Sequence, residues 1–168
     1  MTSNMLNQKL KEQLPRIQIL NKQRRYKIDS ASAVVFCSAV LREMGVSDRS
    51  SSVVFVSEDE IKKLNYNYLQ RNYATDVLCF VYNETMEDGE PLIGEIVIAP
   101  HVSTRNAAQY RNKPENEIRK LLIHGILHLL GYDHEKDDGT MLRLQRRLTH
   151  RNFFKEGEPV LDLSKAYK

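Results

Sequence analysis

Three of the chain's five histidines lie in one short stretch, residues 121–134, with the sequence LLIHGILHLLGYDH. His124 and His128 are four residues apart, so an α-helix would place both imidazoles on one face, one turn apart. Gly131 can take the left-handed conformation that ends a helix, and the turn would return His134 toward the other rings. Three neutral imidazoles leave a fourth position open on a divalent ion, as in catalytic zinc sites. The sequence therefore predicts one zinc ion per chain, bound by His124, His128 and His134.

The spacing H-x-x-x-H-x-x-G-x-x-H is that of the metzincin metalloproteases, with one difference. Those enzymes carry a glutamate, the general base, directly after the first histidine. This chain has Gly125 at that position. The metal ligands of a peptidase are thus present without its base.

Length and composition indicate one domain, residues 1–168, with 41% hydrophobic and 28% charged residues, as in soluble globular proteins. No apolar run reaches the roughly 18 residues that cross a bilayer, and the N-terminal stretch lacks the continuous apolar segment of a secretion signal. Cys37 and Cys79 lie in apolar surroundings without metal-ligand spacing, which indicates buried, reduced thiols. We therefore expect a cytoplasmic protein.

The net charge of +3 is unevenly distributed. Residues 1–28 carry seven Lys or Arg and one Glu, whereas the remaining residues carry 18 positive and 21 negative charges. Residues 1–14 are expected to form a flexible basic arm, either loosely helical or disordered. A basic arm on a mildly acidic body suits a polyanionic partner, although a solvated tail has the same composition.

Hydrophobic periodicity divides the rest of the chain into strands and helices. Alternating or β-branched segments predict strands at residues 16–20, 52–56, 76–82 and 92–99. Helical periodicity predicts helices at residues 31–44, 57–68, 101–112, 114–130 and 139–151. Ser30 and Ser57 are the predicted N-caps of the first two helices, and Asp88-Gly89 marks a turn between two strands.

This order of elements predicts an α+β fold close to the α/β class. A small mixed four-stranded sheet, mostly parallel with one antiparallel hairpin strand, should pack against about five helices. The helix that carries His124 and His128 is apolar on most sides, so we expect it to be buried under the sheet.

Three motifs together resemble the YbeY family of bacterial and organellar proteins. They are HGILHLLGYDH at residues 124–134, TDVLCF at 75–80 and GEIVI at 94–98, and the resemblance extends over about residues 29–151. It implies a single-strand-specific, zinc-dependent endoribonuclease that matures the 3′ end of small-subunit ribosomal RNA and acts in ribosome quality control. Its partners would then be single-stranded RNA, ribosomal RNA and the small ribosomal subunit. The metal ligands of the family map onto His124, His128 and His134.

The chain departs from the family pattern at an arginine that faces the metal and substrate. Family members commonly carry this arginine six residues before the threonine of the TDVLSF-like motif, where this chain has Leu69. Arg71, two residues later, is the nearest guanidinium, and some members have an arginine there too. The resemblance therefore makes Arg71 the candidate catalytic residue for contact with the phosphate.

Three functions fit these observations. A three-histidine zinc lowers the pKa of bound water to about 7 and polarises a phosphoryl oxygen, so an endoribonuclease tolerates the missing glutamate. A zinc metallopeptidase is favoured by the ligand spacing alone. A non-catalytic ribosome-assembly factor would bind RNA and use the metal for structure.

Two further residues near the histidines allow two explanations each. Gly125 would leave room for a phosphodiester beside the metal, or would let a strand or helix approach closely. Asp133 would orient a histidine, or would cap the turn after Gly131.

Overall fold

The computed structural model describes residues 16–85, 87, 89, 91–151 and 159–162 of the 168-residue chain. The predicted basic arm at residues 1–14 lies outside these ranges, as does Asp88 of the predicted turn. Gly89 has a φ of 84°, in the left-handed region that glycine adopts without steric penalty.

The main sheet has four strands in the order β1-β3-β5-β4. They are β1 (Ile17–Asn21), β3 (Ser50–Phe55), β5 (Pro91–Ile98) and β4 (Val77–Thr85). β3 pairs in parallel with β1 and with β5, whereas β4 pairs antiparallel with β5. The predicted mixed sheet, mostly parallel with one antiparallel hairpin strand, is confirmed. β4 forms one edge of the sheet.

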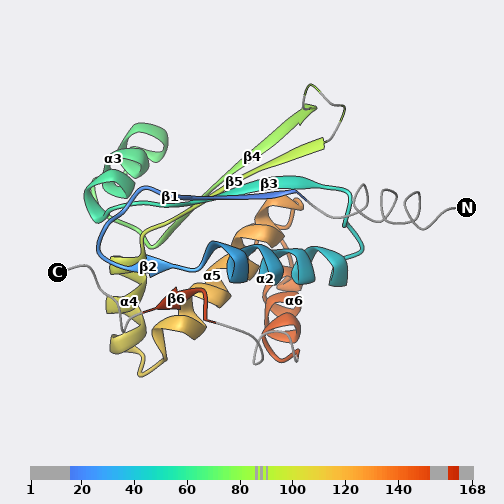
Figure 1. The fold of residues 1–168 in the computed structure, drawn as a ribbon. Helices are drawn as coiled ribbons and strands as arrows, with labels where there is room; N and C mark the ends of the chain where they lie inside the picture. The colour runs from blue at the N-terminus through green and yellow to red at the C-terminus, as the bar shows by residue number, and fades with distance from the viewer. Residues whose placement is uncertain (1–15, 86, 88, 90, 152–158, 163–168) are drawn as a thin grey trace, which may run out of the picture.

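The helices of the described ranges are α2 (Ser30–Glu43), α3 (Glu58–Leu69), α4 (Pro100–Gln109), α5 (Pro114–Leu129) and α6 (Thr140–Thr149). α2, α5 and α6 lie on one side of the sheet, and α3 lies on the other (Figure 1). The predicted α+β architecture with about five helices is therefore confirmed. None of these helices is long and apolar enough to cross a membrane.

The caps of the first two described helices differ in how well the sequence predicted them. Ser57 caps α3, and its hydroxyl accepts a hydrogen bond from the backbone N–H of Glu60 at 3.2 Å. The cap of α2 is Asp29 rather than the predicted Ser30, because the Asp29 carboxylate accepts from the N–H of Ser32 at 2.8 Å. Asp and Ser are similarly good N-caps, so adjacent candidates are not distinguished by type.

A second, two-stranded sheet was not predicted. It pairs β2 (Lys27–Ile28) antiparallel with β6 (Leu161–Asp162). The carboxylate of Glu115, in the first turn of α5, accepts hydrogen bonds from the N–H groups of Val160 and Leu161 at 3.0 and 2.9 Å. Strands of two residues are too short to show any periodicity, so only this long-range contact reveals them.

α5 passes through the centre of the core, as its apolar sequence predicted. Its buried apolar side chains are Ile118, Leu121, Leu122, Ile123, Ile126, Leu127 and Leu129. Gly125 faces β5, where a Cβ atom would lie only 2.7 Å from side-chain atoms of Ile96. Of the two explanations for Gly125, the structure supports the close approach of a neighbouring strand.

We predict that Gly125→Ala overpacks the contact with Ile96. An added methyl group in a packed core costs about 1–3 kcal/mol, against about 1 kcal/mol that alanine gains over glycine in a helix. In the Ile96→Ala protein the obstructing atoms are absent, so the same substitution should then stabilise the fold. Equilibrium denaturation of the parent, both single variants and the double variant measures this coupling. A coupling energy below about 0.3 kcal/mol would contradict the predicted contact.

Candidate metal centre

The end of α5 brings the third histidine toward the first two. Gly131 has a φ of 92°. Its N–H donates to the carbonyl of His128 at 3.0 Å, and the N–H of Tyr132 donates to the carbonyl of Leu127 at 3.1 Å. These two bonds form a Schellman motif, which satisfies carbonyl groups at the helix end and reverses the chain. The predicted role of Gly131 in ending the helix is confirmed.

The three histidines form a compact cluster. The ring centroids of His124 and His128 are 4.7 Å apart, and the His134 ring lies 5.2 and 5.3 Å from them. One ligand nitrogen from each ring lies within 4.8 Å of the others. Two nitrogens bound to one tetrahedral zinc ion are about 3.3 Å apart, since each Zn–N bond is about 2.0–2.1 Å. The Nε2 atoms of His124 and His128 are separated by 3.1 Å, so this group could hold a metal ion.

The surroundings favour the neutral form of the two helical histidines. Burial lowers the pKa of His124, against a smaller raising effect of its hydrogen bond with Gln145. Burial also lowers the pKa of His128, and the neighbouring His124 and His134 lower it further. Both rings therefore stay neutral to a lower pH than a free imidazole. The neutral ring is the form that binds a metal, because a protonated nitrogen has no free lone pair.

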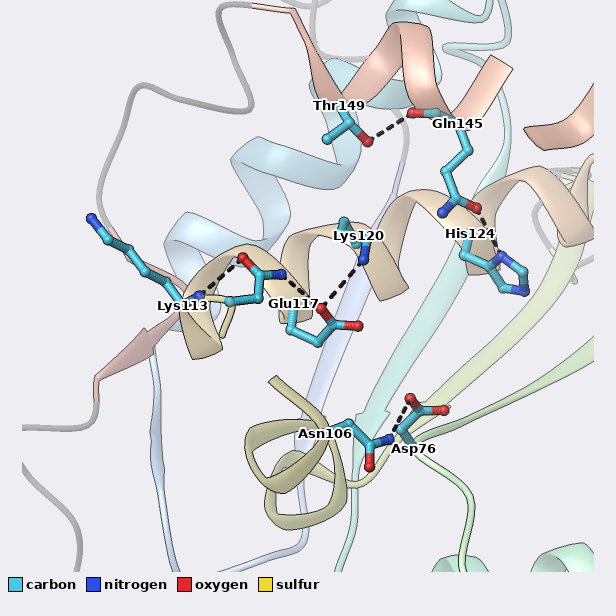
Figure 2. A network of polar contacts seen from close by, with 9 residues as sticks. Asp76, Asn106, Lys113, Glu117, Lys120, His124, Gln145 and Thr149 are labelled. Carbon is cyan, nitrogen blue, oxygen red and sulfur yellow. Dashed lines mark hydrogen bonds and ion pairs between the residues drawn. The ribbon is translucent and has the colours of Figure 1, made fainter. Parts of the chain in front are cut away.

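Gln145 on α6 determines which nitrogen of His124 faces the cluster. Its Oε1 atom lies 2.9 Å from Nδ1 of His124. Figure 2 shows this contact between α6 and α5. Since an amide oxygen only accepts, Nδ1 carries the proton and Nε2 keeps its lone pair for a metal. Thr149 donates to the backbone carbonyl of Gln145 at 2.7 Å. Gln145 was not predicted as a site residue, because nothing local to residue 145 signals a contact 21 residues back along the chain.

A solvent-accessible pocket of about 340 Å³ surrounds the histidines. Its other walls come from the C-terminal half of α3, the segment that follows it and the start of β4. Both Leu69 and Arg71 line this pocket, and both are exposed. The structure thus brings the predicted Arg71 together with all three predicted histidines. Whether Arg71 contacts a phosphate stays a prediction.

The segment that carries Arg71 is tied to α3 by Asn65. Asn65 is almost fully buried, with 1% of its surface exposed. Its side-chain N–H donates to the carbonyl of Tyr73 at 2.9 Å, and its backbone carbonyl accepts from the N–H of Arg71 at 3.3 Å. Gln70, directly before Arg71, has a φ of 58° and ends α3. Asn65 was not predicted as a site residue, although a polar residue between apolar helix positions was a possible signal.

Hydrogen bonds also anchor the residue that precedes β4. Asp76, which precedes β4, accepts a hydrogen bond from the Asn106 side chain of α4 at 3.1 Å (Figure 2). The backbone carbonyl of Asp76 accepts from the N–H of Ala99 at 2.9 Å. The charge of Asp76 also raises the pKa of His124 slightly, although less than burial lowers it. The chain between two pocket-lining residues, Thr75 and Val77, is therefore held by contacts from α4 and from the residue after β5.

Asp133 caps the turn before the third histidine. Its carboxylate accepts from the N–H of Glu135 at 3.0 Å and lies 3.3 Å from the ammonium of Lys136. The backbone hydrogen bond, together with Lys136, lowers the pKa of Asp133. In the part of the chain that the structure describes, no hydrogen bond joins Asp133 to a histidine ring. The structure supports a role in the turn.

Comparison with known proteins assigns this chain to a family. The sequence profile described as "Endoribonuclease YbeY" matches residues 18–152. The chain belongs to the YbeY family. The resemblance inferred from the three motifs is confirmed over most of the chain.

Relatives and a solved structure agree with this assignment. "Endoribonuclease YbeY" of Alkaliphilus oremlandii is 36% identical over 127 residues, which cover 71% of this chain and 84% of the relative. The proteins of the same name from Thermodesulfovibrio yellowstonii and Thermotoga petrophila are 41% and 43% identical, but the match spans only 60% and 61% of their length. The solution structure of TM1509 from Thermotoga maritima covers 79% of this chain and 85% of its own, with 33% identity and a TM-score of 0.53.

We predict that Gln145→Ala weakens the binding of Zn²⁺ by about 10- to 100-fold, because His124 loses the acceptor that orients it. Gln145→Glu keeps an acceptor at this place and should bind Zn²⁺ at least as well as the parent. Competition with a chromophoric chelator measures these affinities. The control is Gln109→Ala, an exposed glutamine at the end of α4. A Gln145→Ala affinity within twofold of the parent would remove this role.

Proposed function

We propose that the protein is a zinc-dependent endoribonuclease that cleaves single-stranded RNA. We further propose that it acts in 3′-end maturation of small-subunit ribosomal RNA and in ribosome quality control, in contact with the small ribosomal subunit. The observation that carries the proposal is the convergence of three histidine nitrogens in an open pocket that also contains an exposed guanidinium. Membership in a family described as endoribonucleases supports the reaction class.

In the proposed site, the metal and the side chains of the protein would have different roles. A bound zinc ion would activate water and neutralise charge on the phosphate. His124, His128 and His134 would hold the ion, and Gln145 would fix the orientation of the first ring. Arg71 would bind two phosphate oxygens at once through its planar guanidinium, which positions the phosphodiester and stabilises the charge of the transition state.

The contact of Gly125 argues against a peptidase of the metzincin type. In the metzincin pattern this position carries the glutamate that acts as general base. Here the position faces Ile96 of β5, with no room for a side chain. The chain therefore keeps the metal ligands but has no place for that base.

A non-catalytic RNA-binding factor is the remaining alternative, and one cleavage assay separates it from the enzyme. Metal-loaded protein should cleave single-stranded RNA, chelated protein should not, and restored Zn²⁺ should restore cleavage. The His124→Ala protein should stay inactive at every metal concentration. Binding of RNA without any metal-dependent cleavage would favour the binding factor, and duplex RNA tests the preference for single strands.

The proposal places the protein in the cytoplasm. Cys37 and Cys79 are both free thiols, and burial raises the pKa of each to about 12. Thiols with so high a pKa are rarely deprotonated at neutral pH, so they react slowly. Two free, unreactive cysteines fit a reducing compartment.

We predict one zinc ion per chain in the parent and a large loss of metal in His128→Ala. Removal of one of three ligands leaves two imidazoles, fewer than the three or four protein ligands of known zinc sites. Elemental analysis of both proteins after gel filtration makes the measurement. The control is His150→Ala, an exposed histidine at the end of α6 and outside the cluster. Equal metal content in the parent and His128→Ala would refute this ligand set.

We predict that Arg71→Ala loses about 2–4 kcal/mol of transition-state stabilisation, or roughly 30- to 1,000-fold in rate. Arg71→Lys should recover only part of this loss, because an ammonium lacks the planar fork. Zinc content and thermal stability should stay near those of the parent, since the residue is exposed. Single-turnover cleavage of RNA measures the rates.

The matched control for Arg71 is Arg42→Ala, an exposed arginine in the last turn of α2, outside the pocket. It should cleave at the parent rate. Arg71→Ala rates within twofold of the parent would leave this arginine without a catalytic role.

A further inference from the structure

One side of the candidate metal pocket has an apolar rim that the proposed chemistry does not use. Leu69 and Tyr73 both line the pocket, with 49% and 54% of their surfaces exposed. Removing a large apolar side chain from water lowers the free energy of the system. Exposed apolar side chains at the mouth of a pocket are therefore a feature of binding sites. These two side chains lie on either side of Arg71 in the sequence.

The backbone that carries the Tyr73 ring is fixed although the ring is exposed. Its carbonyl accepts the hydrogen bond of the buried Asn65 side chain at 2.9 Å. Asn65 also holds the N–H of Arg71, so both residues are tied to the same point of α3. A ligand that contacts Tyr73 therefore does so with little loss of backbone entropy.

The Tyr73 side chain is exposed at the pocket and is not paired with another described aromatic ring. Tyr68, a nearby residue of α3, has its ring in an edge-to-face contact with Phe80, with centroids 4.9 Å apart. Among the described residues no aromatic ring makes such a contact with Tyr73. An exposed aromatic residue therefore lines the same pocket as Arg71 and three potential metal ligands.

We propose that Tyr73 stacks on an unpaired base of the RNA, next to the phosphodiester held by Arg71 and the metal. This inference rests on the proposed function and names the feature of the substrate that the pocket recognises. An aromatic ring stacks on any base, because every base has a π-face, but only where that face is free. Bases within a duplex are covered by their neighbours, so the same contact selects single strands.

The charges around Tyr73 favour a nucleic acid over an apolar protein segment. Arg71 and a divalent ion at the histidines would both attract phosphate. Two carboxylates, Asp133 and Glu135, also line the pocket, but Asp133 is paired with Lys136 at 3.3 Å. With the ion bound, the positive charge exceeds the negative charge at the point where a phosphate would lie.

The test is single-turnover cleavage of single-stranded RNA by the metal-loaded protein, measured over a range of enzyme concentrations. Tyr73→Ala should raise the half-saturating concentration by about 5- to 150-fold, the usual effect of removing one stacked aromatic ring. The maximal rate should change much less. Tyr73→Phe and Tyr73→Trp should stay within threefold of the parent, because both keep a π-face, whereas Tyr73→Leu should resemble Tyr73→Ala.

The matched control is Tyr110→Ala, which removes a ring that is 75% exposed at the end of α4, outside the pocket. It should behave as the parent. RNA with an abasic site beside the mapped cleavage position should bind parent and Tyr73→Ala equally, because the stacking partner is then absent from both complexes. Thermal melting of each variant confirms that it is folded.

Three results would overturn the inference. Half-saturation of Tyr73→Ala within twofold of the parent would show that the ring contacts no base. Full activity of Tyr73→Leu would show that apolar bulk, as for a protein segment, is enough. A parent protein that neither cleaves nor binds single-stranded RNA would refute the proposed function itself, and the parent is measured first so that the two failures are told apart.

Discussion

The close contact between α5 and β5 at Gly125 and Ile96 determines the geometry of the whole site. Because a side chain at position 125 would lie only 2.7 Å from Ile96, the helix can approach the strand this closely only with glycine there. The approach fixes the rotation of α5 about its own axis. Rotation then decides where His124 and His128 point, since both project from the same helix face. These two rings are half-buried while their neighbours in the helix are buried, so this face alone meets the pocket.

Hydrogen bonds to neighbouring groups help to orient the rings of His124 and His128. Gln145 of α6 orients His124, and a hydrogen bond to the backbone at Tyr132 contributes to the environment of His128. Tyr132 itself closes the Schellman motif that returns the chain toward His134. The hydrogen bonds of the Schellman motif therefore both end the helix and direct the chain toward His134. Three side chains that folding has already brought together would lose less entropy on binding an ion than three side chains that are still apart.

Much of this arrangement could be predicted, because it depends on local periodicity. The four main strands, the helices and the histidine cluster follow from spacing within short segments, and the structure has them all. Gln145 and Asn65 could not be predicted in the same way. Each acts through a hydrogen bond to a group that folding brings near, and residue type alone does not specify the partner. The strands β2 and β6 were not predicted for the same reason, since they pair only in the tertiary fold.

The left-handed Gln70 explains how Arg71 reaches a pocket at which the family pattern has an arginine two residues earlier. Leu69 is the last residue of α3, and Gln70, with a φ of 58°, ends the helix directly after it. The reversal brings residue 71 back toward α3, where its N–H bonds to the carbonyl of Asn65. Positions 69 and 71 therefore line one pocket, although they would point in different directions on a continuous helix. Leu69 and Tyr73, on either side of Arg71 in the sequence, give the pocket its apolar rim.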